Sequence, residues 1–177
     1  MISIKLFGKF SVHDAQGNPI AIAGSKTQGL LAFLALNAEL PPTRDRIISL
    51  FWGERFNDQA RQSLRQALRK LRQLLDDAEG EALVVDQERI GLNPAVVEVD
   101  VEAFVSAASQ GDLATTRAAA AMLTGPMLDG LYGMQPEFDD WLALERQRIN
   151  ELAVKVLERS AEQELQQGDP ETALERA

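Results

Sequence analysis

The side chains in this sequence that are best suited to chemistry are arginines and glutamines gathered in residues 59–75. The run carries no acid and five bases, Arg61, Arg65, Arg69, Lys70 and Arg72. The chain as a whole is acidic, with 18 Lys and Arg against 27 Asp and Glu and a formal net charge of -9. Arginine pairs with phosphate oxygens or with both acceptors of guanine, and glutamine exchanges two hydrogen bonds with adenine. These residue types therefore indicate contact with nucleic acid.

A helix through residues 59–75 would sort these side chains onto separate faces, because each residue turns the helix by about 100°. One face is apolar and consists of leucine and alanine. A second face holds the arginines within about 80° of one another. The glutamines lie between the arginine face and the apolar face. The side chains that we predict to contact DNA from this helix are Arg61, Ser63, Arg65, Gln66, Arg69 and Lys70. Arg72 lies near the helix end and can instead serve the C-terminal dipole.

The competing interpretation is an ordinary surface helix with solvated arginines, since Arg and Gln are good helix formers. Solvated helices usually mix both signs of charge and so gain i,i+4 ion pairs. Residues 59–75 lack such mixing, although the chain has acids to spare. We therefore favour nucleic-acid contact for this helix.

Two further arginines are candidate contacts to DNA, each with an alternative. Arg44 opens a predicted helix, where a phosphate often meets the N-terminus, but Asp45 beside it makes a solvated face an equal possibility. Arg89 lies at the tip of a predicted hairpin and can reach a phosphate. Asp86 and Glu88 next to it argue against that contact.

Catalysis, cofactor binding and metal binding find no support in the sequence. His13 is the only histidine and the chain has no cysteine. No Gly-rich phosphate loop, metal-ligand cluster or nucleophile with a histidine partner can be recognised. Asp139 and Asp140 stand at a predicted helix start, where acids interact favourably with the dipole. We therefore expect no enzyme, no cofactor and no metal.

The first 97 residues follow the order strand, strand, helix, helix, helix, strand, strand. Three helices followed by a hairpin are typical of a winged helix-turn-helix, in which the third helix lies in the major groove of DNA. Phe51, Trp52 and Phe56 are expected to wedge the helices together. The expected strands cover residues 2–12, 20–22 and 83–92, and the expected helices begin after the caps Ser25, Thr43 and Asp58.

The remaining residues, 98–177, have a helical pattern and a different charge. Residues 1–100 hold 12 bases and 13 acids, whereas residues 101–177 hold 6 bases and 14 acids. We therefore predict two units, 1–97 and 98–177, with different partners. The longest predicted helix carries an apolar stripe made of Phe138, Trp141, Leu142, Ile149, Leu152, Val156 and Leu165.

The absence of cysteine favours a reducing compartment. The start of the chain lacks the charged and then apolar pattern of a signal peptide, and the longest apolar runs are far too short to span a bilayer. We expect a cytoplasmic protein without a membrane partner.

Four segments resemble the SARP-type transcriptional activators of bacteria, the antibiotic-regulatory-protein family. They are LLAFLAL, RDRIISLFWG, ARQSLRQALRKLR and VDVEAF, in that order along the chain. The later segments LTGPMLDGLYG and PEFDDWLALERQRINELA look like the bacterial transcriptional activation domain that follows in this family. GDPETALERA looks like the start of the next helix in that domain.

The resemblance implies a mixed fold, with a winged helix followed by an all-α, TPR-like domain. It also implies binding to double-stranded promoter DNA, usually as two copies side by side on direct repeats, and contact with RNA polymerase to activate transcription. Carried over by position, it places Arg61, Ser63, Arg65, Gln66, Arg69 and Lys70 on the recognition helix and Arg89 in the wing.

A different class of function stays open beside this one. The acidic helical half can dock a protein partner, so that the chain would be an interaction module of a larger signalling protein that does not bind DNA.

Overall fold

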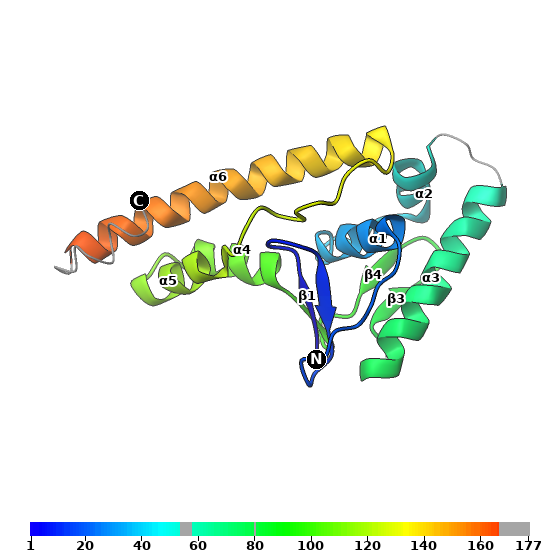
Figure 1. Ribbon diagram of the computed structural model, residues 1–177, viewed down its shortest axis with the longest axis horizontal. Helices are drawn as coiled ribbons and strands as arrows, with labels where there is room; N and C mark the ends of the chain where they lie inside the picture. Colours follow the sequence, from blue (N-terminus) through cyan, green and yellow to red (C-terminus); the bar gives the residue numbers. More distant parts are fainter. Residues whose placement is uncertain (54–57, 80, 167–177) are drawn as a thin grey trace.

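The computed structural model describes residues 1–53, 58–79 and 81–166. An N-terminal hairpin is followed by three helices, a second hairpin, a short strand and three more helices (Figure 1). The bounds are β1 Ile2–Lys5, β2 Ser11–His13, α1 Ser25–Ala35, α2 Arg44–Trp52, α3 Asp58–Glu79, β3 Leu83–Val85, β4 Ile90–Leu92, β5 Val97–Val99, α4 Asp100–Gln110, α5 Leu113–Met122 and α6 Pro136–Gln166.

The winged helix predicted from the sequence is present. Helices α1, α2 and α3 are followed by the antiparallel hairpin β3–β4, in which Val85 pairs with Ile90. The hairpin lies between α1 and α3 in Figure 1, in the position of a wing beside α3. Phe51 is fully buried and Trp52 packs against the core, as expected, whereas Phe56 lies outside the described residues.

The N-terminal sheet has the order β2-β1-β5, with β1 antiparallel to β2 and parallel to β5. Strand β5 was not predicted. It directly precedes α4, so one short strand connects the winged helix to the helical half. The strand predicted over residues 20–22 is wrong, because these described residues add no strand to either sheet; the nearby isolated bridge joins Pro19 to His13, and Ile22 is buried in the core with Ile20 packed against it.

Local capping explains where the first two helices begin. The Thr43 side chain accepts a hydrogen bond from the backbone N–H of Arg46 at 3.2 Å, which confirms the predicted cap of α2. Ser25 was expected to cap α1, and this prediction is wrong. Ser25 is the first helical residue, and the capping position is taken by Gly24 with φ 91°, a backbone conformation that glycine adopts without strain.

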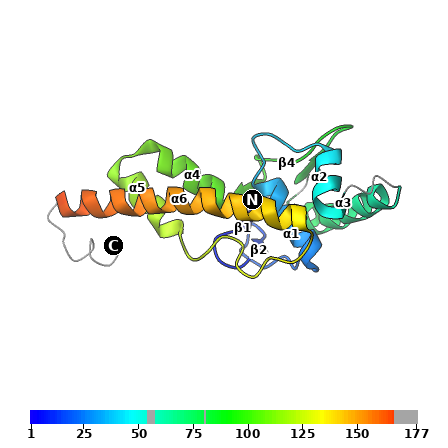
Figure 2. The same cartoon turned by 90° about the horizontal axis from the view of Figure 1, so that it is seen from above.

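The helical half consists of α4, α5 and the long α6, which runs across both parts of the molecule (Figure 2). The stripe predicted for α6 is confirmed for Phe138, Leu142, Ile149 and Val156, which are buried. It is wrong for Leu165, which is 59% exposed, because in this last turn the side of α6 that faces α5 carries the buried Glu164, and Leu165 is turned away from it.

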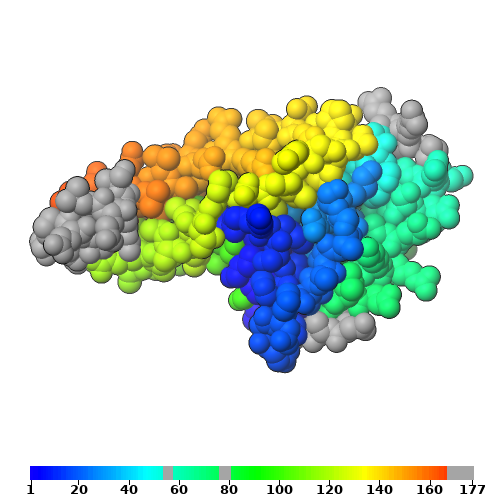
Figure 3. All heavy atoms as spheres, in the orientation of Figure 1, coloured from blue at the N-terminus to red at the C-terminus, as the bar shows by residue number. Residues whose placement is uncertain are grey.

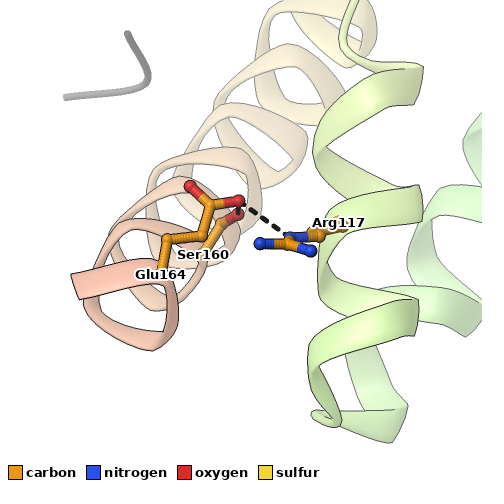
Figure 4. A network of polar contacts seen from close by, with 3 residues as sticks. All are labelled: Arg117, Ser160 and Glu164. Atoms are coloured by element: carbon orange, nitrogen blue, oxygen red, sulfur yellow. Dashed lines mark hydrogen bonds and ion pairs between the residues drawn. The ribbon is translucent and has the colours of Figure 1, made fainter. Parts of the chain in front are cut away.

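A charged contact holds the far end of α6 to α5. Arg117 Nε lies 3.0 Å from Glu164 Oε1, and Ser160 Oγ lies 3.5 Å from the same oxygen (Figure 4). The Glu164 side chain is fully buried, so removing it from water is costly and the guanidinium of Arg117 offsets that cost.

The winged helix and the helical half share one core. At the start of α6, the Phe138 ring lies 4.9 Å from the Phe51 ring of α2, and the Trp141 ring lies 4.8 Å from the Phe33 ring of α1. Gly29 of α1 allows this approach, since a Cβ there would lie 2.5 Å from the Met134 side chain. One cluster of buried side chains includes residues on both sides of residue 97. The division into two units at this residue therefore stays a prediction.

The segment before α6 is also attached to the N-terminal hairpin. Leu128 donates a backbone hydrogen bond to the Leu6 carbonyl at 2.7 Å, and Gly8 donates to the Pro126 carbonyl at 3.0 Å. Arg146 of α6 donates to the Met127 carbonyl of the same segment at 2.9 Å. The helical half is therefore anchored to the sheet as well as to α1 and α2.

Candidate nucleic-acid interface

Helix α3 presents its arginines and glutamines to the surface. Ala60, Leu64, Leu68, Leu71 and Leu75 are buried against the rest of the winged helix. The polar residues on the other sides of the helix are exposed, and they are Arg61, Gln62, Arg65, Gln66, Arg69, Lys70, Arg72 and Gln73. The division into faces predicted from the helical period is therefore present in the structure.

In the space-filling view, α3 forms the outer edge of the molecule at the end away from α5 (Figure 3). No part of the helical half covers it in the two ribbon views (Figures 1 and 2). The apolar side of α3 is fixed by the core and the opposite side is open, which is the geometry a helix needs to enter a DNA groove.

The side chains of Arg61 and Arg65 line a cleft of about 280 Å³ between α3 and the start of α2. Arg44 and Asp45 line the α2 side, and Ile48 and Leu64 complete the walls. Three guanidinium groups against one carboxylate favour an anion in this cleft. A backbone phosphate is an anion of suitable charge and size.

The other residues predicted on α3 occupy different positions. Gln66 directly follows Arg65, Arg69 lies one turn beyond it, and both are exposed, whereas Ser63 is half-buried at the edge of the apolar side. Lys70 points along the protein surface and donates from Nζ to the Ala23 carbonyl at 3.1 Å. It connects α3 to the segment before α1, a contact that the sequence did not predict.

Arg44 and Arg89 also make contacts within the protein. Arg44 Nη2 donates to the Asp86 carbonyl at 3.0 Å, and Arg89 Nη1 donates to the Pro41 carbonyl at 2.6 Å. Both bonds join the wing to the start of α2. The exposed Asp86 carboxylate is engaged by its own turn, since its Oδ1 accepts the backbone N–H groups of Glu88 and Arg89 at 2.7 and 2.6 Å.

These backbone bonds influence the titration of the wing turn. The hydrogen bonds from the N–H groups of Arg89 and Glu88 hold the pKa of Asp86 below its ordinary value of 3.8, with a smaller contribution from the Arg89 charge. The carboxylate is therefore ionised and engaged by its own turn at neutral pH.

Lys26 positions the end of α2, a role that sequence reasoning missed. Its Nζ donates to the Phe51 carbonyl at 2.9 Å and lies 5.2 Å from the centre of the Trp52 ring. A cation at a helix C-terminus interacts favourably with the unpaired carbonyl groups. Burial lowers the pKa of Lys26.

The described parts of the chain hold neither a cluster of metal ligands nor a membrane-spanning helix. Residues 1–53, 58–79 and 81–166 contain no group of three His, Asp or Glu side chains placed to hold a metal ion. In the same ranges, no helix combines the length and the apolar character needed to cross a bilayer.

Residues 17–91 match the family model described as "Transcriptional regulatory protein, C terminal". The matched segment contains α1, α2, α3 and the wing, which are the elements that form the candidate interface. A comparison with curated protein sequences finds no significant match.

The chain is also similar to a solved structure of Mycobacterium tuberculosis EmbR in complex with a low affinity phosphopeptide. The TM-score is 0.76 and the sequence identity is 23%. The similarity covers 95% of this chain and 46% of the EmbR chain, so this chain spans less than half of that protein's length. The similarity extends the fold assignment from the matched segment to the helical half. Together, the two findings support the resemblance to SARP-type regulators.

Proposed function

Starting from residues 17–91 as a DNA-binding winged helix of the transcriptional regulatory protein type, we propose that this chain activates transcription from promoter DNA. Helix α3 enters the major groove and the wing approaches the flanking backbone. The helical half contacts protein partners, RNA polymerase among them. The place of action is the cytoplasm.

One observation carries the proposal, namely the exposed face of α3 with its arginines and glutamines and no acid between residues 59 and 75. Arg61 and Arg65 stand beside the α2 cleft, where a phosphate can be held. Gln66 and Arg69 lie further along the exposed face, in reach of base edges. Ser63 and Lys70 are proposed as further contacts at the edges of this face.

The protein contacts are proposed from charge and family. Residues 101–177 hold 14 acids and 6 bases, so this half repels DNA and attracts basic surfaces. Two copies side by side on direct repeats would place two α3 helices in successive major grooves.

Selection of genomic DNA fragments by the purified chain tests the proposal, followed by affinity measurements on the selected sequence at several salt concentrations. Each phosphate contact adds about -0.9 to the slope of log K against log salt. Arg65→Ala should weaken binding and reduce the size of the slope by about 1 without unfolding the domain. Gln147→Ala, at an exposed position of α6, is the matched control. Absence of binding at low salt, or indifference to Arg65→Ala and Arg61→Ala, would refute the proposal.

The alternative is a protein-interaction module that has no DNA-binding role, and the acidic charge of residues 101–177 favours it. Under this alternative, the chain would bind a purified polymerase or a basic partner while promoter fragments are not retained even at low salt. That result would replace the first proposal.

A further inference from the structure

We infer that Arg44 and Arg89 are positioning residues that brace the wing against the start of α2, and that phosphate binding is not their main role. The inference rests on the proposed function, because it concerns how the two DNA-facing elements are held relative to each other. This role differs from the contacts to DNA phosphates that the sequence suggested for the two arginines.

The brace consists of paired contacts between residues 41–44 and the wing. The Arg89 side chain donates to the Pro41 carbonyl at 2.6 Å, and the Arg44 side chain donates to the Asp86 carbonyl at 3.0 Å. Two backbone bonds run between them, from Ile90 N–H to the Pro42 carbonyl at 3.0 Å and from Arg44 N–H to the Glu88 carbonyl at 2.8 Å.

The local sequence suits this arrangement. Pro41 and Pro42 have no backbone N–H, so they can take part in hydrogen bonds only through their carbonyls. Each carbonyl receives a donor from the wing, one from the Arg89 side chain and one from the Ile90 backbone.

Close packing gives independent support. A Cβ placed on Gly91 of β4 would lie 3.0 Å from Pro41 Cγ and 3.1 Å from Pro41 Cβ. The strand is therefore seated against the proline so tightly that a side chain at Gly91 would push the two segments apart.

The charges at the wing tip also argue against phosphate binding as the main role of the two arginines. Residues 86–89 are exposed and carry two acids and one base, so the turn has little net attraction for phosphate. Arg44 is only partly exposed and its Nε atom is buried, which places the guanidinium within the protein surface. A guanidinium held in this way fixes geometry, and the wing and α3 then meet DNA as one rigid surface.

The first test needs no DNA and uses amide hydrogen exchange of the full chain. Arg89→Met removes the donor to Pro41 and keeps the apolar part of the side chain. The amides of Arg44 and Ile90, which donate across the brace, should exchange about tenfold faster or more. Arg46→Met, which removes an exposed arginine of α2 that takes no part in the brace, is the matched control and should leave both amides unchanged.

The second test measures DNA affinity against salt. Arg89→Met should weaken binding by about tenfold without changing the salt slope, because a mispositioned wing loses complementarity and no ion is released. Gly91→Val alters no charge and should have the same effect by pushing β4 away from Pro41. Arg61→Met, at the proposed phosphate cleft, should reduce the slope by about 1.

The outcomes separate the brace from the proposed function. Faster exchange at Arg44 and Ile90 with an unchanged slope supports the brace. Unchanged exchange overturns it, and so does a slope reduced by about 1 in Arg89→Met, whatever the exchange shows. If the wild-type chain binds no DNA, the proposed function fails, and hydrogen exchange alone decides whether the brace exists.

Discussion

Replacing Phe138 with alanine tests whether the winged helix and the helical half are one cooperative unit. Phe138 lies in the first turn of α6 but is fully buried against the winged helix. Its ring lies 4.9 Å from the Phe51 ring and 5.3 Å from the Trp141 ring. Truncation therefore opens a cavity at the joint of the two halves and leaves every charge in place.

The expected loss of stability is large. A buried Phe→Ala substitution costs about 3–5 kcal/mol, and each aromatic pair contributes about 0.5–1.5 kcal/mol beyond its buried area. Because Phe138 is fully buried and has two ring partners, we expect about 4–5 kcal/mol. With a urea dependence of about 2 kcal/mol per M, the unfolding midpoint should fall by about 2 M.

Urea unfolding followed by circular dichroism and by amide exchange in α3 measures both halves. One transition with the same lowered midpoint is expected from both signals, because α2 and α6 share their core. Leu144→Ala, at a position of α6 that is 68% exposed, should shift the free energy by less than about 0.5 kcal/mol. If α3 kept its wild-type midpoint in Phe138→Ala, the reasoning from a shared core would be refuted.

Three other perturbations have defined outcomes. Arg117→Met should destabilise the chain by about 2–3 kcal/mol in thermal unfolding, because it removes a cation from buried Glu164 and Arg117 itself is 40% exposed. Asp100→Ala should cost about 2 kcal/mol, because the backbone N–H groups at the end of β1 lose their carboxylate acceptor; a change under 0.5 kcal/mol would contradict it. Since the pKa of Asp86 is lowered, the ionised carboxylate supports the wing turn above pH 3.8 and this support is lost as the pH falls further. The Arg89 amide resonance should therefore titrate with a midpoint below 3.8, and a midpoint above that value would show that the turn does not hold the carboxylate.

Features that depend on residues close together in the sequence could be predicted. The faces of α3 follow from the helical period alone, so the buried leucines and the exposed arginines were placed correctly. The Thr43 cap and the turn of the wing depend on residues only a few positions apart. Ser25 failed as a cap because Gly24 could adopt the required backbone conformation at the same boundary.

Contacts between distant segments could not be predicted in this way. The hydrogen bond from Arg89 to Pro41 spans 48 residues and that from Lys70 to Ala23 spans 47. An arginine or lysine at these positions has the same local pattern whether its partner is a phosphate or a carbonyl of its own chain. The distance to that partner is set by the packing of helices and strands, and it appears in no local periodicity.

By itself, the sequence determined the order of the three helices and the wing hairpin and the basic face of α3, because each depends on neighbours within one or two helical turns. Only the tertiary structure decided that α6 begins inside the core of the winged helix and that Arg44 and Arg89 join the wing to α2. The physical reason is that hydrogen bonds and aromatic contacts act over a few ångströms, and folding alone brings residues dozens of positions apart within that range.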